Sequence, residues 1–351
     1  MESPNQGLIA KRLNVSRTTV SRSLANHPAI SADTRAKVLE MADELGYRQS
    51  PGRRARRAQA AIRDVTLGVL IGVPAENVAL ATFPYLLKGI RECAEVERVK
   101  VDIHYQPPGE FDPAATRQPV FRHIRGGDWR GVLLIYPFAE PAVEAIAKKI
   151  STVSLLENYA NPLVDTIDTD EDTAMVTLVR QLAAAGHQRI GYLTWHYPVG
   201  GHWALQRFGG YVEGLFSLGL EFNPSWVLNI HRDSPRLSNP QLCDAVMHHA
   251  RESGVTAWVC AADHQAYQLM ADLQVRGIRV PEDISITGFD GLEPPPHLRR
   301  VTSMQVPHED IGIAGISRLL NRIVHPNSPR RKILVEAKLV EGQSIAPPRR
   351  A

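Results

Sequence analysis

The middle of the chain alternates between short, continuous apolar runs and longer segments in which apolar residues recur every three or four positions. Continuous runs such as 131–136 (GVLLIY) are typical of parallel strands that are buried on both faces, and the recurring positions are typical of helices that cover them. The pattern predicts strands at 67–73, 99–105, 131–136, 151–156, 189–195, 227–230, 256–263 and 284–290. It predicts helices at 84–95, 120–124, 142–149, 173–185, 206–218, 241–253 and 264–276.

Repeated β-α units of this kind predict doubly wound parallel sheets with helices on both faces. The units are too many for one compact sheet, so we expect an α/β core of two similar lobes. The length of 351 residues, of which 44% are apolar, suffices for about two or three domains with ordinary cores.

In the first 47 residues the apolar positions recur only at helical spacing, in three short stretches separated by polar turns. Asn5, Ser16 and Ser31 stand immediately before these stretches, where their side-chain oxygens can accept hydrogen bonds from the free N–H groups of a first helical turn. We expect helices at 6–13, 17–25 and 32–45. We expect the third helix to face the core with Ala36, Leu39, Met41, Ala42 and Leu45. The N-terminal region is therefore predicted to be a small all-α headpiece.

The second of these helices has a polar, basic face. Val20 and Leu24 lie four residues apart and are expected to point inward, whereas Arg17, Thr18 and Arg22 share a side that has no apolar residue. Two helices joined by a short turn, the second basic at its start, form a helix-turn-helix. Arg and small hydroxyl side chains there can read base edges in the major groove. A plain three-helix bundle with a solvated face is the alternative.

Short hydroxyl side chains in this region suit contacts with phosphates, which fix register without reading sequence. These are Ser16, Thr19, Ser21, Ser31 and Thr34. The charge distribution agrees, because residues 1–63 hold twelve Lys/Arg and five Asp/Glu, a net +7, whereas residues 64–351 hold 28 and 32, a net −4. A basic module attached to a near-neutral remainder of the chain is typical of a protein that binds a polyanion.

Residues 15–47 (VSRTTVSRSLANHPAISADTRAKVLEMADELGY) resemble the DNA-binding headpiece of the LacI/GalR family of bacterial transcription regulators. The stretches AAAGHQRIGYL (183–193), RFGGYVEGL (207–215) and GIRVPEDISITGFDG (277–291) resemble the periplasmic-binding-protein-like core of the same family. The resemblance implies a homodimer that binds double-stranded operator DNA. It also implies a small effector, expected to be a sugar or sugar derivative, held between the two lobes.

The resemblance also implies the domain organisation. The headpiece would span 1–47, a basic hinge 48–64, and the effector-binding and dimerisation core 65–351. In the family's fold the chain crosses between the lobes three times, here near Asp168, Arg299 and Pro326. Lobe one would comprise about 65–168 and 300–326, and lobe two about 169–299 and 327–351.

The hinge segment 48–64 (RQSPGRRARRAQAAIRD) contains a basic cluster. Its arginines are Arg53, Arg54, Arg56 and Arg57. A solvated linker is one interpretation. In the LacI/GalR family the corresponding segment is a short helix that enters the minor groove of the operator with a wedge leucine. Here Ala58 stands at the leucine position, so we expect the arginines rather than a wedge to contact the minor groove, whose negative potential attracts them.

Ligands of doubly wound sheets bind at the carboxyl ends of the strands, so residues there are candidates for the effector site. They are Phe83, Glu157, Asp168, Arg207, Asp263 and Asp290. Carboxylates, an arginine and an aromatic ring suit a polyhydroxylated ligand, because its hydroxyls bond to charged groups and its apolar face stacks on the ring. The resemblance places Arg207 and Asp290 among the effector-holding residues. The alternatives are an interlobe salt bridge for Arg207, a turn or helix-cap aspartate for Asp290, and a core residue for Phe83.

No catalytic or metal-binding pattern accompanies these residues. The sequence has no Walker loop, HExxH or GxSxG motif, its histidines lack metal-ligand spacing, and Cys93, Cys243 and Cys260 are isolated. We therefore expect no enzyme activity, no metal and no cofactor. The sequence also has no apolar run long enough to span a membrane and no secretory signal at its start, so we expect a cytoplasmic protein without a membrane partner.

These features together predict a sequence-specific transcription regulator, expected to be a repressor, whose operator affinity is modulated allosterically by an effector. Two alternatives remain open. One is a dimeric DNA-binding regulator that responds to no effector. The other is a solute-binding protein of transport, against which the headpiece and the missing secretory signal both count.

Overall fold

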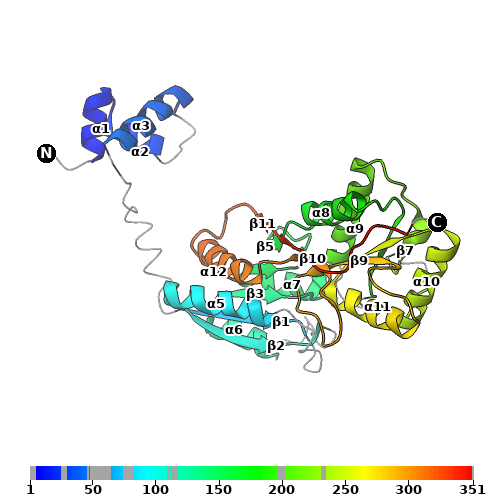
Figure 1. The fold of residues 1–351 in the computed structure, drawn as a ribbon. Helices are drawn as coiled ribbons and strands as arrows, with labels where there is room; N and C mark the ends of the chain where they lie inside the picture. Colours follow the sequence, from blue (N-terminus) through cyan, green and yellow to red (C-terminus); the bar gives the residue numbers. More distant parts are fainter. Residues whose placement is uncertain are drawn as a thin grey trace. The chain divides into compact units, whose positions relative to one another are not determined.

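The computed structural model describes residues 5–24, 30–45, 47, 65–73, 83–108, 111, 118–196, 202–230 and 235–349. The chain divides into two units, Met1–Ile62 and Arg63–Ala351 (Figure 1). The expected hinge at 48–64 lies outside the described residues. The same holds for its arginines Arg53, Arg54, Arg56 and Arg57.

The N-terminal unit contains three short helices, α1 (Gln6–Leu13), α2 (Arg17–Leu24) and α3 (Ala32–Glu44). Each predicted cap is present. The side chains of Asn5, Ser16 and Ser31 accept a hydrogen bond from the backbone N–H three residues further on, at 2.9, 2.9 and 3.2 Å. Because each cap satisfies an N–H that has no partner within the helix, it fixes where that helix begins.

The core of this unit differs from the expected one on α3. Its buried residues are Ile9, Ala10, Val20, Val38 and Ala42. Val38, which was not expected there, and Ala42 lie one turn apart and face inward, whereas Ala36 is exposed and Leu39 is 50% exposed. Apolar residues lie all around this helix, so periodicity alone did not identify the side that packs against α1 and α2.

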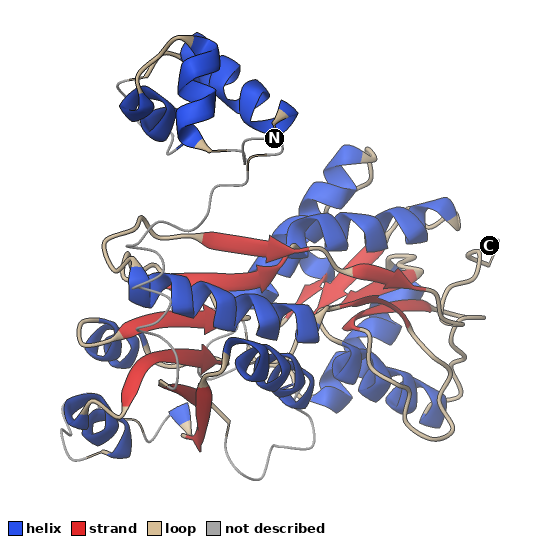
Figure 2. Cartoon of the chain, turned by 90° about the vertical axis from the view of Figure 1, so that its left-hand side faces the viewer, coloured by secondary structure: helices blue, strands red, loops and turns tan. Residues whose placement is uncertain are grey.

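The first sheet of the core unit has six parallel strands in the order β11-β5-β4-β3-β1-β2 (Figure 2). They are β1 (Thr66–Ile71), β2 (Lys100–Tyr105), β3 (Trp129–Ile135), β4 (Ser151–Leu155), β5 (Val164–Thr169) and β11 (Lys332–Val335). The helices of this lobe are α5 (Phe83–Glu97), α6 (Pro119–Gly126), α7 (Glu140–Ala147) and α12 (His308–Val324). Helices α6 and α7 share one apolar cluster with the strands, and α5 packs against α12.

The second sheet repeats this order as β12-β10-β9-β8-β6-β7, with only β12 antiparallel to its neighbour. Its strands are β6 (Ile190–Leu193), β7 (Val227–Leu228), β8 (Ala257–Cys260), β9 (Ser285–Asp290), β10 (Thr302–Gln305) and β12 (Lys338–Val340). Its helices are α8 (Glu171–Ala184), α9 (His202–Ser217), α10 (Asn239–Glu252) and α11 (Asp263–Val275). The predicted fold class, a helical headpiece followed by two parallel-sheet lobes, is confirmed.

Two of the three crossings between the lobes lie later in the chain than expected. The first, between β5 and α8, is close to Asp168 as expected. The second follows β10 rather than Arg299, because β10 pairs with β9 in the second sheet. The third lies between β11 and β12 rather than near Pro326, because β11 pairs with β5 in the first sheet. The approximate boundaries near 300 and 326 therefore shift toward the C-terminus, because 302–305 belongs to lobe two and 332–335 to lobe one.

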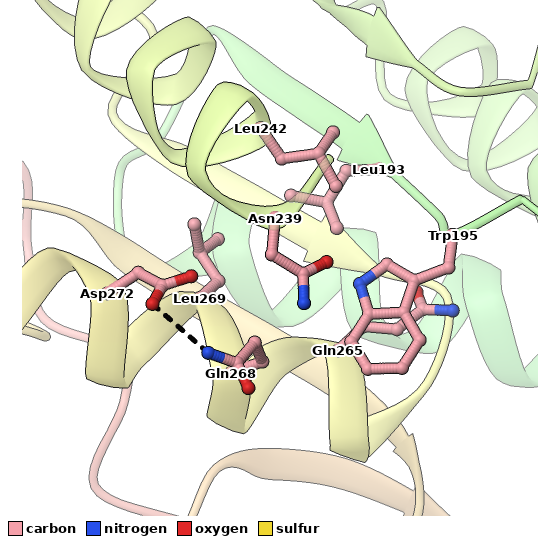
Figure 3. A pocket seen from close by; sticks show the side chains of 8 residues that line it. All are labelled: Leu193, Trp195, Asn239, Leu242, Gln265, Gln268, Leu269 and Asp272. Atoms are coloured by element: carbon pink, nitrogen blue, oxygen red, sulfur yellow. Dashed lines mark hydrogen bonds between the residues drawn. The ribbon is translucent and has the colours of Figure 1, made fainter. Parts of the chain in front are cut away.

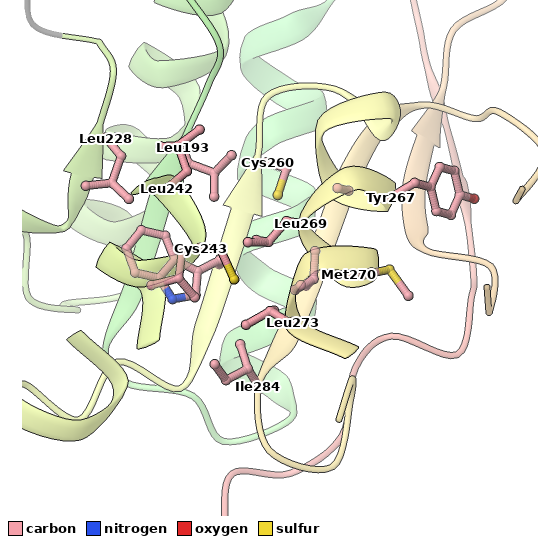
Figure 4. Packing of buried hydrophobic residues seen from close by; sticks show 14 of the residues in the cluster. Leu193, Leu228, Leu242, Cys243, Cys260, Tyr267, Leu269, Met270, Leu273 and Ile284 are labelled. Carbon is pink, nitrogen blue, oxygen red and sulfur yellow. The ribbon is translucent and has the colours of Figure 1, made fainter. Parts of the chain in front are cut away.

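Each lobe places a tryptophan ring over a glycine of the neighbouring strand. The indole of Trp129 on β3 occupies the space that a Cβ would need at Gly68 on β1, and Trp258 on β8 does the same at Gly191 on β6. Trp258 is fully buried in the apolar cluster that joins α10 and α11 to the second sheet. It is therefore a core residue. Figure 4 shows other members of this cluster, such as Leu242 of α10 and Leu273 of α11.

Candidate functional site

The start of α2 presents the polar face that the sequence predicts. Arg17, Thr18, Ser21 and Arg22 are exposed, whereas Val20 is fully buried against the other helices. Residues three and four apart on a helix lie on one side of it, so these four side chains form one accessible surface. A single helix with such a surface fits the major groove, where its side chains can reach base edges.

The hydroxyl groups at the starts of α2 and α3 are oriented by the helix caps. The Ser16 and Thr19 hydroxyls lie 2.8 Å apart, and the Ser31 hydroxyl donates to that of Thr34 at 2.8 Å. Both serines are exposed, and both threonines are half-buried. These groups sit at the N-termini of α2 and α3, where free N–H groups and the helix dipole favour an anion such as a phosphate.

Arg207 is the centre of a buried ion-pair network in the core unit. It projects from α9, and its side chain is 7% exposed. Its Nε donates to Glu171 at 2.9 Å, and its Nη1 lies 3.4 Å from Asp290. The same Nη1 donates to the Ala261 carbonyl at 2.6 Å. The two carboxylates come from α8 and from the end of β9, so one guanidinium ties three elements of the second lobe together.

Aromatic rings enclose this guanidinium. Its central carbon lies 3.8 Å from the ring centroid of Phe289 and 4.6 Å from that of Trp203. Stacking of this kind stabilises a cation that has been withdrawn from water. Trp195, further along the same sheet edge, meets the ring of His264 at 4.8 Å between centroids.

Two further carboxylates reach the network from the first lobe. Glu157 follows β4 and Asp168 lies in β5, and both are buried. Among the described residues, neither side-chain oxygen of Glu157 nor Oε2 of Glu171 has a hydrogen-bond partner. A buried acceptor without a partner is costly, and a ligand that brings hydroxyl or N–H donors would satisfy it.

Burial shifts the protonation of these carboxyl groups. Burial and the negative charge of Asp168 raise the pKa of Glu157 to about 8. Burial likewise raises the pKa of Glu171 to about 8 and that of Asp290 to about 6, although Arg207 opposes both shifts. One guanidinium cannot neutralise several buried carboxylates, so part of this group carries protons near neutral pH and can donate hydrogen bonds as well as accept them.

Two histidines complete the surroundings of Arg207. His264 comes from α11 of the second lobe and His308 from the start of α12 of the first. Burial, assisted by the positive charge of Arg207, lowers the pKa of each to about 4, so both rings are neutral at physiological pH. The network therefore draws on both lobes. Neither histidine was among the expected site residues, nor was Glu171. His264 directly follows the predicted strand 256–263, but only Asp263 was singled out there, and neither Glu171 nor His308 follows a predicted strand.

Asp263 and Phe83 have structural partners of their own. Asp263 accepts hydrogen bonds from the Leu292 N–H at 2.6 Å and the Ser303 hydroxyl at 2.7 Å, and it is fully buried. It thereby joins the start of α11 to the loop after β9 and to β10. Phe83 is 3% exposed and begins α5 rather than preceding it, with its ring 5.7 Å from that of Tyr105. The alternative of a core residue accounts for Phe83.

A small pocket lies in the second lobe between α10 and α11, beside the end of β6 (Figure 3). Trp195, Gln265 and Asp272 are among the residues that line it. None of the six predicted effector residues does so. The charged network around Arg207 is therefore the better candidate for an effector site.

Comparison with protein families agrees with this architecture. Residues 9–50 match the family of bacterial regulatory proteins of the lacI type, and residues 179–345 match the periplasmic binding protein-like domain. Within the residues that the structure describes, no helix is long and apolar enough to cross a membrane.

Individual relatives align over nearly their whole length. The probable HTH-type transcriptional repressor ExuR of Bacillus subtilis (strain 168) is 24% identical over 96% of this chain and 97% of that protein. Among solved structures, the transcriptional regulator CelR in complex with cellobiose has a TM-score of 0.65 at 21% identity, covering 97% of this chain and 99% of its own. The lac repressor dimer bound to operator and the anti-inducer ONPF has a TM-score of 0.64 at 21% identity, covering 96% and 98%. The chain thus joins a helix-turn-helix domain of the lacI family of bacterial regulatory proteins to a periplasmic-binding-protein-like domain.

Proposed function

We propose that this protein is a transcriptional repressor that reads its operator with the exposed face of α2. The observation that carries the proposal is the match of residues 9–50 to the lacI family on a helix whose Arg17, Thr18 and Arg22 are exposed. Two headpieces from a homodimer would contact two half-sites, as symmetric operators require. Such a protein acts where the DNA is, in the cytoplasm, and we expect it to catalyse no reaction.

We further propose that a sugar or sugar derivative binds at the network around Arg207. The unpartnered oxygens of Glu157 and Glu171 are acceptors suited to hydroxyl groups, and Trp203 supplies an aromatic ring beside them. Relatives point to the same chemistry by name, such as the ribose operon repressor of Haemophilus influenzae, which is 25% identical over 96% of this chain. Contributions from both lobes would let the ligand bias their closure. Effector and operator must then alter each other's affinity by the same factor.

Base reading by α2 can be tested with Arg22→Ala. We expect the variant to lose about 1–3 kcal/mol of affinity for the preferred operator and to relax discrimination at one base pair. Sites selected from genomic fragments would supply the operator, and fluorescence anisotropy would measure binding to it and to single-base variants. Arg125→Ala, a substitution of an exposed arginine in the core unit, is the matched control. Uniform weakening on all sequences would instead make Arg22 a phosphate contact.

The effector site can be tested by thermal shift against a panel of pentoses, hexoses and disaccharides. We expect at least one sugar to raise the melting temperature and to change operator affinity. Asp290→Ala should abolish that response and leave operator binding without sugar nearly intact. A folded Asp290→Ala variant that still responds would remove Asp290 from the site. If no ligand is found, the regulator that responds to no effector becomes the better reading.

The hinge arginines are proposed to enter a narrow minor groove without a wedge. Replacing Arg53, Arg54, Arg56 and Arg57 by glutamine should then flatten the salt dependence of operator binding. Each lost phosphate neutralisation lowers the slope by about 0.9. The variant should also lose its preference for an A·T-rich operator centre. An unchanged slope, or a strong operator bend caused by the unmodified protein in gel phasing, would contradict this proposal.

A further inference from the structure

A cluster of metal-ligand side chains lies on the first lobe, far in sequence from the residues of the proposed effector site. Among the described residues, one group of three His, Cys, Asp or Glu side chains has ligand atoms within 4.8 Å of one another: Asp102, His104 and His123. Asp102 and His104 are two positions apart on β2 and so lie on the same face of the sheet. His123 reaches them from α6.

The two residues on β2 are close but poorly aligned for a hydrogen bond. The Nε2 of His104 lies 3.0 Å from Oδ1 of Asp102, yet this buried nitrogen makes no hydrogen bond in the described part of the chain. Two atoms that approach closely without hydrogen-bond alignment are arranged as ligands of one ion would be. Ligands at about 2.1 Å from a tetrahedral Zn²⁺ stand roughly 3.4 Å apart.

The surroundings orient the ligands as metal sites do. His123 Nδ1 lies 3.1 Å from Oδ2 of Asp128, which leaves Nε2 of the ring free to bind an ion. Trp129 donates from Nε1 to Oδ2 of Asp102 at 2.9 Å and stacks on His123 with ring centroids 4.9 Å apart. A carboxylate behind a ligating histidine and a donor behind a ligating carboxylate are the usual outer partners of bound metals.

Gly68 makes this arrangement possible. It stands opposite Asp102 in the pairing of β1 with β2, and a side chain there would collide with the indole of Trp129. Without that side chain the indole crosses β1 and reaches Asp102 on the edge strand. The site is hard to recognise from sequence, because two ligands lie on a strand and the third lies on a helix nineteen residues later, with no short metal-binding spacing.

We propose that Asp102, His104 and His123 bind a divalent transition metal ion of the Zn²⁺ type. Two imidazoles and one carboxylate are ligands that zinc, nickel and iron(II) accept and that calcium and magnesium do not favour. The side chains of the three residues are 38%, 27% and 29% exposed, so water can complete the coordination. The ion would fasten the edge strand β2 to α6 and stabilise the first lobe, because it closes the loop between them.

The test uses the full chain, freed of metal with a chelator and then titrated with ZnCl₂ by calorimetry. We expect one equivalent to bind and to raise the melting temperature. His104→Gln and His123→Gln should abolish both effects, and Asp128→Asn should weaken binding about 10- to 100-fold, because it removes only the orienting carboxylate. His248→Gln is the matched control. His248 is exposed on α10 beside His249, and it does not belong to the cluster of Asp102, His104 and His123.

Circular dichroism would show that each variant is folded, and Asp102→Asn, which preserves the shape of the side chain, gives a second means of removing a ligand. Cobalt(II) in place of zinc should give visible absorption bands that disappear in His123→Gln. Failure of the unmodified chain to bind one equivalent of zinc would overturn the proposal. So would tight binding that survives in folded His104→Gln and His123→Gln, or that is lost in His248→Gln. None of these outcomes depends on operator or sugar binding.

Discussion

Both lobes contain an ion pair between equivalent helices, but the pair is buried in lobe two and exposed in lobe one. In lobe two, Arg207, the sixth residue of α9, pairs with Glu171 at the start of α8 at 2.9 Å. In lobe one, Lys88, the sixth residue of α5, pairs with Glu309 near the start of α12 at 2.8 Å. The side chains of the first pair are 7% and 3% exposed, whereas those of the second are 58% and 43% exposed.

The difference shows that burial, and not the presence of an ion pair, marks the candidate site. The exposed pair remains in high dielectric and contributes little. The buried pair sits among carboxyl groups with raised pKa values and beside acceptors that have no partner. A ligand is one way to satisfy such groups, which is why the network of lobe two is proposed as the effector site while its counterpart in lobe one is not.

Removing Arg207 should have the largest effect on stability. Arg207→Ala leaves the Glu171 and Asp290 carboxyl groups buried without their cation, and we expect a loss of about 3–5 kcal/mol in the free energy of unfolding. Urea unfolding of the purified chain measures it. Arg125→Ala, the exposed control, should change this free energy by less than about 0.5 kcal/mol. A loss below about 1 kcal/mol for Arg207→Ala would mean that the two ion pairs are equivalent after all.

The tryptophan-over-glycine contact offers a second comparison. Gly191→Ala and Gly68→Ala should each cost about 1–3 kcal/mol, because the added methyl group displaces a buried indole. Gly68→Ala should cost about 1 kcal/mol more, since displacing Trp129 also breaks its hydrogen bond to Asp102. Trp258 has no such hydrogen bond to lose within the described residues. Equal losses in thermal or urea unfolding would contradict this reading.

The pH dependence of stability tests the raised pKa of Glu157. Its pKa is raised to about 8 in the folded chain, so between about pH 4.5 and pH 8 the folded state binds a proton that the unfolded state has released. This contribution is fully present at low pH and is lost as pH rises through the folded pKa. We expect Glu157→Gln to stabilise the chain at pH 8 by at least about 1 kcal/mol and to flatten the fall in stability between pH 6 and pH 8. If Glu157→Gln leaves the change in the free energy of unfolding between pH 6 and pH 8 as it is in the unmodified chain, this prediction is wrong.

The exposed pair of lobe one should give the smallest effect. Lys88→Ala removes a contact that water can replace, so we expect the smallest loss in the free energy of unfolding of these variants, decreasing further at high salt. Unfolding in urea at low and high ionic strength tests this. A loss as large as that of Arg207→Ala would show that exposure does not distinguish the two lobes.

Local patterns predicted most of the fold. The caps at Asn5, Ser16 and Ser31 and the apolar strands are visible in sequence because short-range chemistry determines them. Residues 302–305 and 332–335, which form β10 and β11, were not predicted as strands and lie beyond the approximate lobe boundaries, because pairing with a distant partner, and no local feature, decides their sheet.

The same limit applies to the site. Arg207 and Asp290 were found at the ends of predicted elements, and they do meet. Glu171 was missed because the first residue of a helix carries no sign of which arginine will reach it. His264 and His308 were missed for the same reason, since only the packed lobes bring them near Arg207.

The exchange of segments between the lobes has a consequence for synthesis of the protein. Helix α12 packs on strands that emerge from the ribosome well over a hundred residues earlier, and the last two strands, β11 and β12, complete one sheet each. Neither lobe can therefore close its sheet until almost the entire chain has been translated. A ribosome that stalls before Lys332 would release two incomplete sheets with open edges, which proteases and chaperones recognise. A protein built in this way reaches its folded form only after the segment that contains β11 and β12 has been translated.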